Sequence, residues 1–184
     1  ITQLRGIREI VVALALLPPC LGAKLELFGR FSPPHLEPEI RGLPGWEHVR
    51  YHGWQSQEQL SSTMAACRLG LVTFLPAPNH TESQPNKLFE YMAYGLPVVS
   101  SDLPSTRPFV PPDVGLLAGA DDAAGHAAAL LRLLGDGATA EALGAAARWR
   151  LHWRTWATTW WLLNLCQRSP SARRNWRQRR VSAR

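Results

Sequence analysis

Residues 82–102 read Glu-Ser-Gln-Pro-Asn-Lys-Leu-Phe-Glu-Tyr-Met-Ala-Tyr-Gly-Leu-Pro-Val-Val-Ser-Ser-Asp. They predict a loop, a helix, a turn and a strand, in that order. Pro85 suits the first turn of the helix, because its ring fixes φ and its missing N–H would have no partner there. Leu88, Met92 and Ala93 recur at helical spacing and give the helix an apolar face.

A glycine and a proline mark the end of this helix. Gly95 can adopt the left-handed conformation that ends a helix, and Pro97 prevents the helix from continuing. Val98 and Val99 follow as a short apolar run, which is typical of a strand buried in a parallel sheet. The stretch is therefore expected to form a helix-turn-strand unit.

Two carboxylates belong to this stretch, Glu82 just before the helix and Glu90 within it. An acid, seven residues, a second acid, a helix end of small residues and a Gly-x-Pro-Val-Val strand form a pattern that resembles the donor-binding signature of the GT-B glycosyltransferases, especially glycosyltransferase family 4. Two glutamates at this spacing mean little alone, so the resemblance depends on the whole run from Pro85 to Val99. An ordinary helix-turn-strand with surface acids is the alternative.

The resemblance implies a site for a nucleotide-diphosphate sugar. The N-terminus of the helix offers free N–H groups and the positive end of the helix dipole, which suit a diphosphate. Ionised Glu90 only accepts hydrogen bonds, so it can hold ribose hydroxyls. Glu82 matches the catalytic position, where it would contact sugar hydroxyls and stabilise positive charge at the anomeric carbon. The other expected donor-binding residues here are Ser83, Gln84, Asn86, Lys87 and Leu88, although Lys87 could equally be a solvated surface residue.

Three further donor-binding positions match the family pattern. Arg5 stands in an Arg-Gly pair where the family usually has Lys-Gly, and its planar guanidinium can bind two phosphate oxygens. Gly29 matches the turn after the family's second strand. Trp54 matches the loop beside the nucleobase, on which its ring could stack. A solvated arginine and a packed loop tryptophan are the alternatives.

The rest of the chain alternates strands with helices, which predicts an α/β fold with a Rossmann-like parallel sheet and helices on both faces. Ligands of such sheets bind beyond the carboxyl ends of the strands, so the loops after Gly29, Gly53 and Phe74 should share one crevice with Glu82. Strands are expected at 24–29, 49–53, 69–74, 98–99 and 114–117. Helices are expected at 7–17, 36–43, 56–67, 85–94 and 123–134 and from about 138, the last either ending or continuing into a third closing helix near 150, and a turn or short helix is expected at 103–109. Ser56 with Gln59 predicts a capping box, and Asp121-Asp122 are expected to cap a helix.

GT-B enzymes have two Rossmann-like domains, and the resemblance covers only the second. Residues 1–167 are therefore expected to be the donor-binding domain with its closing helices, and the acceptor domain and opening strand are expected upstream of Ile1. The predicted function is retaining, metal-independent transfer of a sugar to an unknown acceptor in glycan biosynthesis. The alternative is a non-catalytic module that binds nucleotide sugars or offers an interaction surface.

No metal and no cofactor are predicted. Asp102 and Asp113 each lack a second acid two residues away, so the chain has no Asp-x-Asp motif. Cys20, Cys67 and Cys166 form no metal-binding or disulfide spacing, which favours a reducing compartment. A cytoplasmic location is the resulting prediction.

The formal net charge of +6 is concentrated at the end of the chain, where residues 168–184 contain seven arginines and no acid. This segment is predicted to be a disordered tail, and without a groove-reading motif no nucleic-acid partner is expected. Before it, Trp149, Trp153, Trp156 and Trp160 follow one helical face. We expect this row to pack on a core, while peripheral contact with the inner face of a membrane is the alternative.

Overall fold

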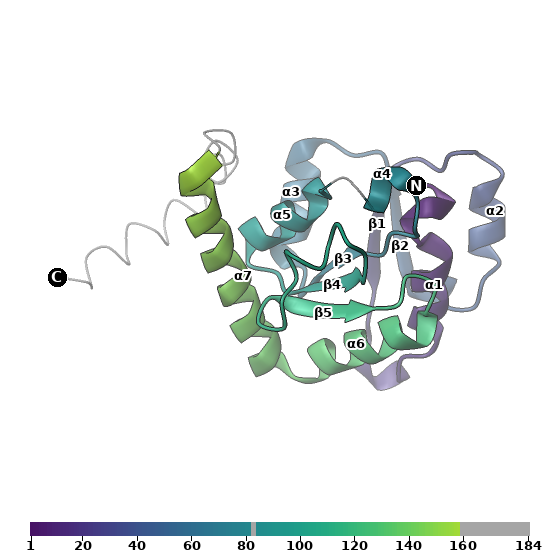
Figure 1. The fold of residues 1–184 in the computed structure, drawn as a ribbon. Helices are drawn as coiled ribbons and strands as arrows, with labels where there is room; N and C mark the ends of the chain where they lie inside the picture. The colour runs from purple at the N-terminus through teal and green to yellow at the C-terminus, as the bar shows by residue number, and fades with distance from the viewer. Residues whose placement is uncertain (82–83, 159–184) are drawn as a thin grey trace. The chain divides into compact units, whose positions relative to one another are not determined.

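The computed structural model describes residues 1–81 and 84–158, the last six of these as helical backbone only (Figure 1). Residues 1–148 form one compact unit, and a second unit begins at residue 149. Glu82 and Ser83 lie outside the described residues, as does the predicted tail. The side chains of Trp153, Trp156 and Trp160 lie outside them too, so the tryptophan row stays a prediction; Trp149 is exposed.

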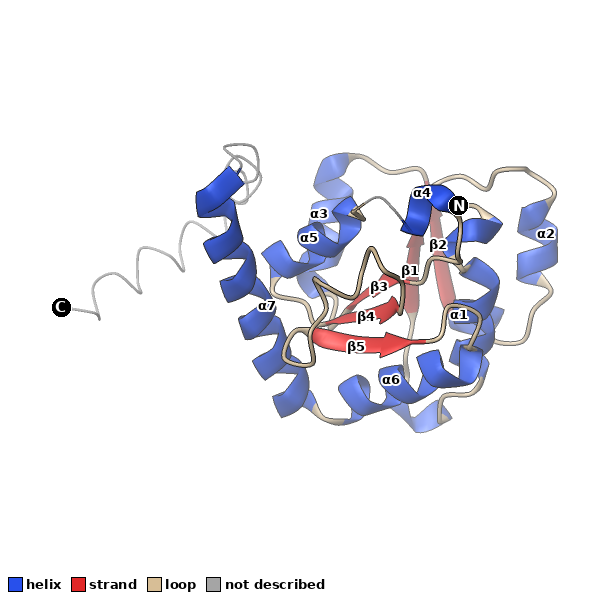
Figure 2. Ribbon diagram, in the orientation of Figure 1, coloured by secondary structure: helices blue, strands red, loops and turns tan. Residues whose placement is uncertain are grey.

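Five strands occur in the described residues, and all of their pairings are parallel (Figure 2). β1 (Leu25–Phe28) pairs with β2 (Val49–Gly53) in one sheet. β3 (Gly70–Val72), β4 (Val98–Ser101) and β5 (Gly115–Ala118) form a second sheet in that order. The predicted α/β fold with parallel strands is confirmed. The strands form two sheets rather than one, because β1 and β3 do not pair with each other.

Helices cover both faces of the β3–β5 sheet, as predicted. α5 and α6 lie on opposite sides of it, with α3 next to α5 and α1 next to α6 (Figure 1). The helices are α1 (Ile7–Ala15), α2 (Leu36–Arg41), α3 (Gln57–Ala66), α4 (Pro78–Thr81), α5 (Asn86–Tyr94), α6 (Ala123–Gly135) and α7 (Gly137–Thr158), and the short 3-10 turns are η1 (Gln3–Arg5), η2 (Pro19–Leu21) and η3 (Trp46–His48).

The core is centred on β4. Every residue of this strand is buried, and Val98 pairs with Gly70 of β3 on one side and with Gly115 of β5 on the other. Large apolar side chains of α1 and α6 pack against Val99 in the main hydrophobic cluster. The apolar run that predicted a buried strand therefore does form the centre of the sheet.

The helix of the opening stretch, α5, begins one residue later than predicted. Pro85 precedes the helix with an extended backbone (φ −77°, ψ 109°), and its carbonyl accepts a hydrogen bond from the N–H of Leu88 at 3.0 Å. It is therefore the N-cap residue, whose carbonyl joins the helix while its own dihedrals stay outside it. At the other end Gly95 adopts φ +70° and donates to the carbonyls of Tyr91 and Met92, as predicted.

Two predicted helix caps are also confirmed. The Oγ of Ser56 accepts a hydrogen bond from the Gln59 N–H at 3.3 Å, and the Gln59 side chain accepts one from the Ser56 N–H at 3.1 Å. Asp122 accepts a hydrogen bond from the N–H of Gly125 at 2.8 Å and so caps α6. No helix in the described ranges has the length and apolar character needed to cross a bilayer.

Candidate functional site

Residues 1–5 connect the carboxyl ends of β1 and β3. Just beyond β1, the N–H of Ser32 donates to the carbonyl of Ile1 at 2.8 Å. Just beyond β3, the N–H of Leu75 donates to the carbonyl of Leu4 at 2.9 Å. The loops that follow these two strands therefore meet at one edge of the molecule, where the fold class places a ligand.

The Arg5-Gly6 pair is fixed against the end of β3. The hydroxyl of Thr73 donates to the carbonyl of Arg5 at 3.0 Å. Gly6 has φ +66°, and a Cβ at this position would lie 1.7 Å from the carbonyl oxygen of Thr73. Only glycine fits here, because the two backbones approach too closely for any side chain. The glycine of the pair therefore sets the position of the arginine before it.

Arg5 and Lys87, two of the predicted basic residues, both act electrostatically on the Ile1 amino group. The pKa of the Ile1 amino group is lowered by burial, and further by the positive charges of Arg5 and Lys87. Arg5 and Lys87 are both exposed. Lys87 belongs to the first turn of α5.

The other predicted residues around α5 differ in exposure. Gln84 and Asn86 are exposed, and Glu90 is half-buried, with no ion-pair partner among the described residues. Leu88 has no exposed surface, so its side chain belongs to the core. Its backbone N–H donates a hydrogen bond to the carbonyl of Pro85. Burial, followed by the negative charges of Glu90 and Cys67, raises the pKa of Tyr91 to about 12.

Gly29 and Trp54, the predicted positions after β1 and β2, lie beside each other. Gly29 adopts φ +113°, and its N–H donates to the carbonyl of Gly53 at 2.7 Å. The hydroxyl of Tyr51 donates to the carbonyl of Gly29 at 3.0 Å. Trp54 follows directly and is 69% exposed, so its ring is available to a ligand. No described contact joins Trp54 to Arg5 or Lys87.

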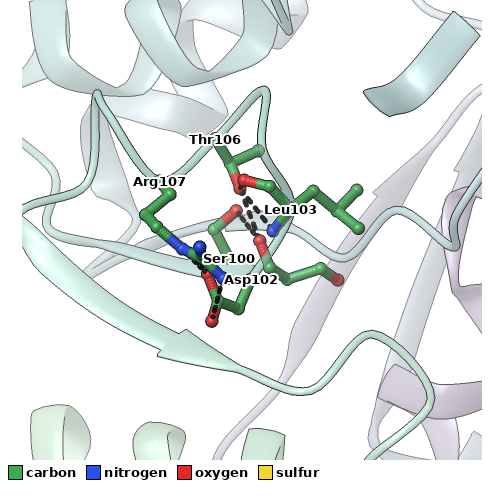
Figure 3. A network of polar contacts seen from close by, with 6 residues as sticks. Ser100, Asp102, Leu103, Thr106 and Arg107 are labelled. Atoms are coloured by element: carbon green, nitrogen blue, oxygen red, sulfur yellow. Dashed lines mark hydrogen bonds and ion pairs between the residues drawn. The ribbon is translucent and has the colours of Figure 1, made fainter. Parts of the chain in front are cut away.

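A polar network at the carboxyl end of β4 was not predicted (Figure 3). The hydroxyl of Thr106 donates to the carbonyl of Ser101 at 2.6 Å and accepts from the N–H of Leu103 at 3.1 Å. Arg107 donates to both carboxylate oxygens of Asp102, at 2.8 and 3.0 Å. This hydrogen bonding holds the pKa of Asp102 below its usual value. The network fixes the turn that follows β4.

The loops after β3 and β4 are joined by residues that the sequence analysis also missed. The hydroxyl of Ser105 donates to the backbone carbonyl of His80. The residue His80 is 8% exposed. The ring of His80 stacks on Phe74 with centroids 4.4 Å apart and is 3.1 Å from the carbonyl of Leu75 through Nδ1. Ser105 and His80 are distant in sequence, so no local pattern could have indicated their contact.

Within the residues that the structure covers, no group of three or more histidine, cysteine or acidic side chains could hold a metal ion. Cys20 and Cys67 are free thiols. Burial, and secondarily the negative charge of Glu26, raises the pKa of Cys67.

Comparison with known proteins found one family model that matches this chain. The family model described as Glycosyl transferases group 1 matches residues 3–136. The match includes the Arg5-Gly6 pair, the loops after all five strands and the whole of α5. A search of curated proteins found no match.

Solved structures of similar fold are numerous. Sucrose-phosphate synthase of Thermosynechococcus elongatus is 25% identical with a TM-score of 0.72, over 98% of this chain and 44% of that one. HepE of Anabaena in complex with UDP-glucose is 22% identical with a TM-score of 0.71, over 84% and 42% of the two chains. The catalytic domain of cholesterol-alpha-glucosyltransferase from Helicobacter pylori is 16% identical with a TM-score of 0.64, over 83% and 92%. The chain thus spans less than half of the first two proteins.

Proposed function

The chain belongs to the glycosyl transferases group 1 family, and we therefore propose that it binds a nucleotide-diphosphate sugar at the carboxyl edge of its strands. We propose further that it supplies the donor-binding half of a retaining, metal-independent glycosyltransferase. The observation that carries this proposal is the Arg5-Gly6 pair of the family pattern, which is held against the carboxyl end of β3 at Thr73. Complexes of the similar HepE with UDP and UDP-glucose support the choice of ligand class.

The diphosphate is assigned to the basic groups and the helix N-terminus. The guanidinium of Arg5 can donate two parallel hydrogen bonds to phosphate oxygens, while Lys87 acts as a compact positive charge. The first N–H groups of α5 add the positive end of the helix dipole. Groups of this kind stabilise the negative charge that develops on a leaving diphosphate. They would do here what a metal ion does in other transferases.

The remaining donor groups are assigned from the positions that they match in the family pattern. Glu90 would accept hydrogen bonds from the ribose hydroxyls, and Trp54 would stack on the base. Glu82 would contact the sugar as the catalytic carboxylate, with Ser83, Gln84, Asn86 and the main chain of Leu88 nearby. The acceptor would bind mainly to a further Rossmann-like domain of the complete enzyme.

A non-catalytic nucleotide-sugar-binding module is the second candidate. Its donor-binding residues would be the same, and it would lack only the transfer step. Release of UDP from UDP-glucose, followed with and without a complete acceptor domain, separates the two. A module would bind the donor and release no UDP in either case.

Binding calorimetry with UDP, GDP and ADP tests the proposed site. Glu90→Gln keeps the size of the side chain but removes its charge, so we expect it to weaken the preferred diphosphate by about 1.5–3 kcal/mol. Glu58→Gln, on the exposed side of α3, is the matched control and should leave the affinity unchanged. Equal affinity in wild type and Glu90→Gln would contradict the ribose assignment, and no binding of any diphosphate would contradict the proposed function.

A further inference from the structure

Three side chains from separate segments meet at the carboxyl end of β3, and they are called the Phe74 cluster below. The guanidinium carbon of Arg5 lies 5.5 Å from the centroid of the Phe74 ring. The ring of His80 stacks on Phe74 at 4.4 Å, with an interplanar angle of 23°. The cluster brings η1, the residue after β3 and α4 together, and Figure 1 shows α4 beside the N-terminus.

The main chain on both sides of Phe74 is held by hydrogen bonds to η1. Thr73, before it, donates its hydroxyl to the carbonyl of Arg5, and Leu75, after it, donates its N–H to the carbonyl of Leu4. These hydrogen bonds fix the backbone of residue 74 relative to Arg5. The position of the Phe74 ring therefore does not depend on the aromatic contact alone.

His80 is held on the other side of the cluster. Its Nδ1 lies 3.1 Å from the carbonyl of Leu75, and its own carbonyl accepts the hydroxyl of Ser105 from the loop after β4. With 8% of its surface exposed, the imidazole has little freedom to leave Phe74. The cluster thus links the loops of β3 and β4 to the arginine that is assigned to the diphosphate.

We propose that Phe74 and His80 are positioning residues that hold the Arg5 guanidinium at the edge of the sheet, ready to bind a diphosphate. This rests on the proposed function, because it concerns the same site. A free arginine side chain loses rotamer entropy when it binds, and a guanidinium already held over a ring has lost part of it beforehand. The proposal also gives a reason for arginine at position 5: a planar guanidinium stacks on a ring and still presents a fork of donors, whereas a lysine ammonium is a strongly hydrated point charge.

A double-mutant cycle on the full chain tests this, with UDP and uridine as the probes. Arg5→Ala should weaken UDP binding about tenfold or more and leave uridine nearly unchanged, since only UDP carries the diphosphate. Phe74→Leu keeps an apolar side chain but removes the ring, and should weaken UDP about two- to fivefold, the range of an exposed cation–π contact. In the Arg5→Ala background the same change should have no effect on UDP binding.

Conservative and control variants separate positioning from general packing. Phe74→Tyr keeps the ring and should restore UDP binding, while Phe109→Leu removes a half-buried ring of the loop after β4 and should not alter it. A ring-current shift of the Arg5 Nε–H in NMR spectra should be present in wild type and Phe74→Tyr and absent in Phe74→Leu. This measurement reports on the contact whether or not a nucleotide is bound.

The outcomes distinguish the inference from the function on which it rests. If Phe74→Leu weakens UDP equally with and without Arg5, or does not weaken it at all, the inference is overturned while UDP binding stands. If wild-type protein that shows the ring-current shift binds neither UDP nor another nucleoside diphosphate, the proposed function is contradicted instead.

Discussion

The β1–β2 pair and the β3–β5 sheet contain similar apolar residues, yet they are buried to different extents. All four residues of β4 are buried, because the strand is paired on both edges and covered by helices. All four residues of β1 are only half-buried, and this strand pairs on one edge, with β2. Apolar composition alone therefore does not decide burial in this chain: β4, which ends in two serines, is buried throughout and lies between two strands, whereas β1 has one neighbouring strand.

The link between β1 and β3 is long enough to allow one additional strand between them. The ends of β1 and β3 are connected by residues 1–4, and four residues span at most about 14 Å. Two inter-strand spacings come to about 9.5 Å. With one strand between β1 and β3, the order would be that of a doubly wound sheet. The opening strand expected from the sequence stays a prediction, and it would cover the exposed edge of β1.

The largest expected effect concerns the link between these two regions. Gly6→Ala places a Cβ 1.7 Å from the Thr73 carbonyl oxygen, so the backbone of η1 must move away from β3. We expect a loss of roughly 4 kcal/mol or more of unfolding free energy, at the upper end of single substitutions. Urea unfolding followed by tryptophan fluorescence measures it.

Gly22→Ala is the matched control for this change. Gly22 has a similar φ of +55°, but a Cβ there would meet nothing within 4 Å. Only the left-handed backbone should then be penalised, by about 1–2 kcal/mol. Equal losses for the two variants would show that residues 1–5 are not held against β3 as described.

The next prediction compares the two sheets by making the same valine-to-alanine substitution in each. Val99→Ala in β4 removes two methyl groups from a side chain with no exposed surface, and should destabilise the protein by about 2–3 kcal/mol. Val49→Ala in β2 removes the same groups from a half-buried side chain, and we expect about 1 kcal/mol. Thermal and urea unfolding of both variants would measure the difference. A Val49→Ala loss as large as that of Val99→Ala would contradict the comparison.

Local signals predicted most of the elements, and they were sufficient wherever neighbouring residues determine the conformation. Gly95 and Pro97 ended α5, Ser56 and Gln59 formed a capping box, and the adjacent valines formed a buried strand. The Arg-Gly pair was identified by resemblance, and the close approach of backbones at Gly6 supplies its physical reason.

Several of the missed features depend on the packing of distant segments. Nothing near Ser105 indicates that its hydroxyl reaches His80, and nothing near Phe74 indicates an arginine from η1 over its ring. The division of the strands into two sheets was missed for the same reason, since pairing is decided between segments. The roles assigned to Glu90 and Trp54 stay predictions, because burial and position alone do not identify a ligand.

The smallest effect concerns an ion pair at the carboxyl end of β4. Asp102 accepts two hydrogen bonds from Arg107, and this lowers its pKa below the usual value of 3.8. A carboxyl group with a lowered pKa in the folded state stabilises the fold above its unfolded pKa, and this contribution disappears as the pH falls through the folded pKa. Asp102→Asn should therefore be less stable than wild type above about pH 5, and the difference should shrink as the pH falls through the folded pKa.

Because both side chains are largely exposed, the difference should be small and should shrink further in high salt. Unfolding midpoints in urea, measured from pH 2 to pH 7 for wild type, Asp102→Asn and Arg107→Gln, test this. Arg107→Gln removes the same interaction from the other side and should give the same pH profile as Asp102→Asn. A gap between wild type and Asp102→Asn that persists unchanged at pH 2 would show that Asp102 acts through its shape and uncharged hydrogen bonds rather than through its charge.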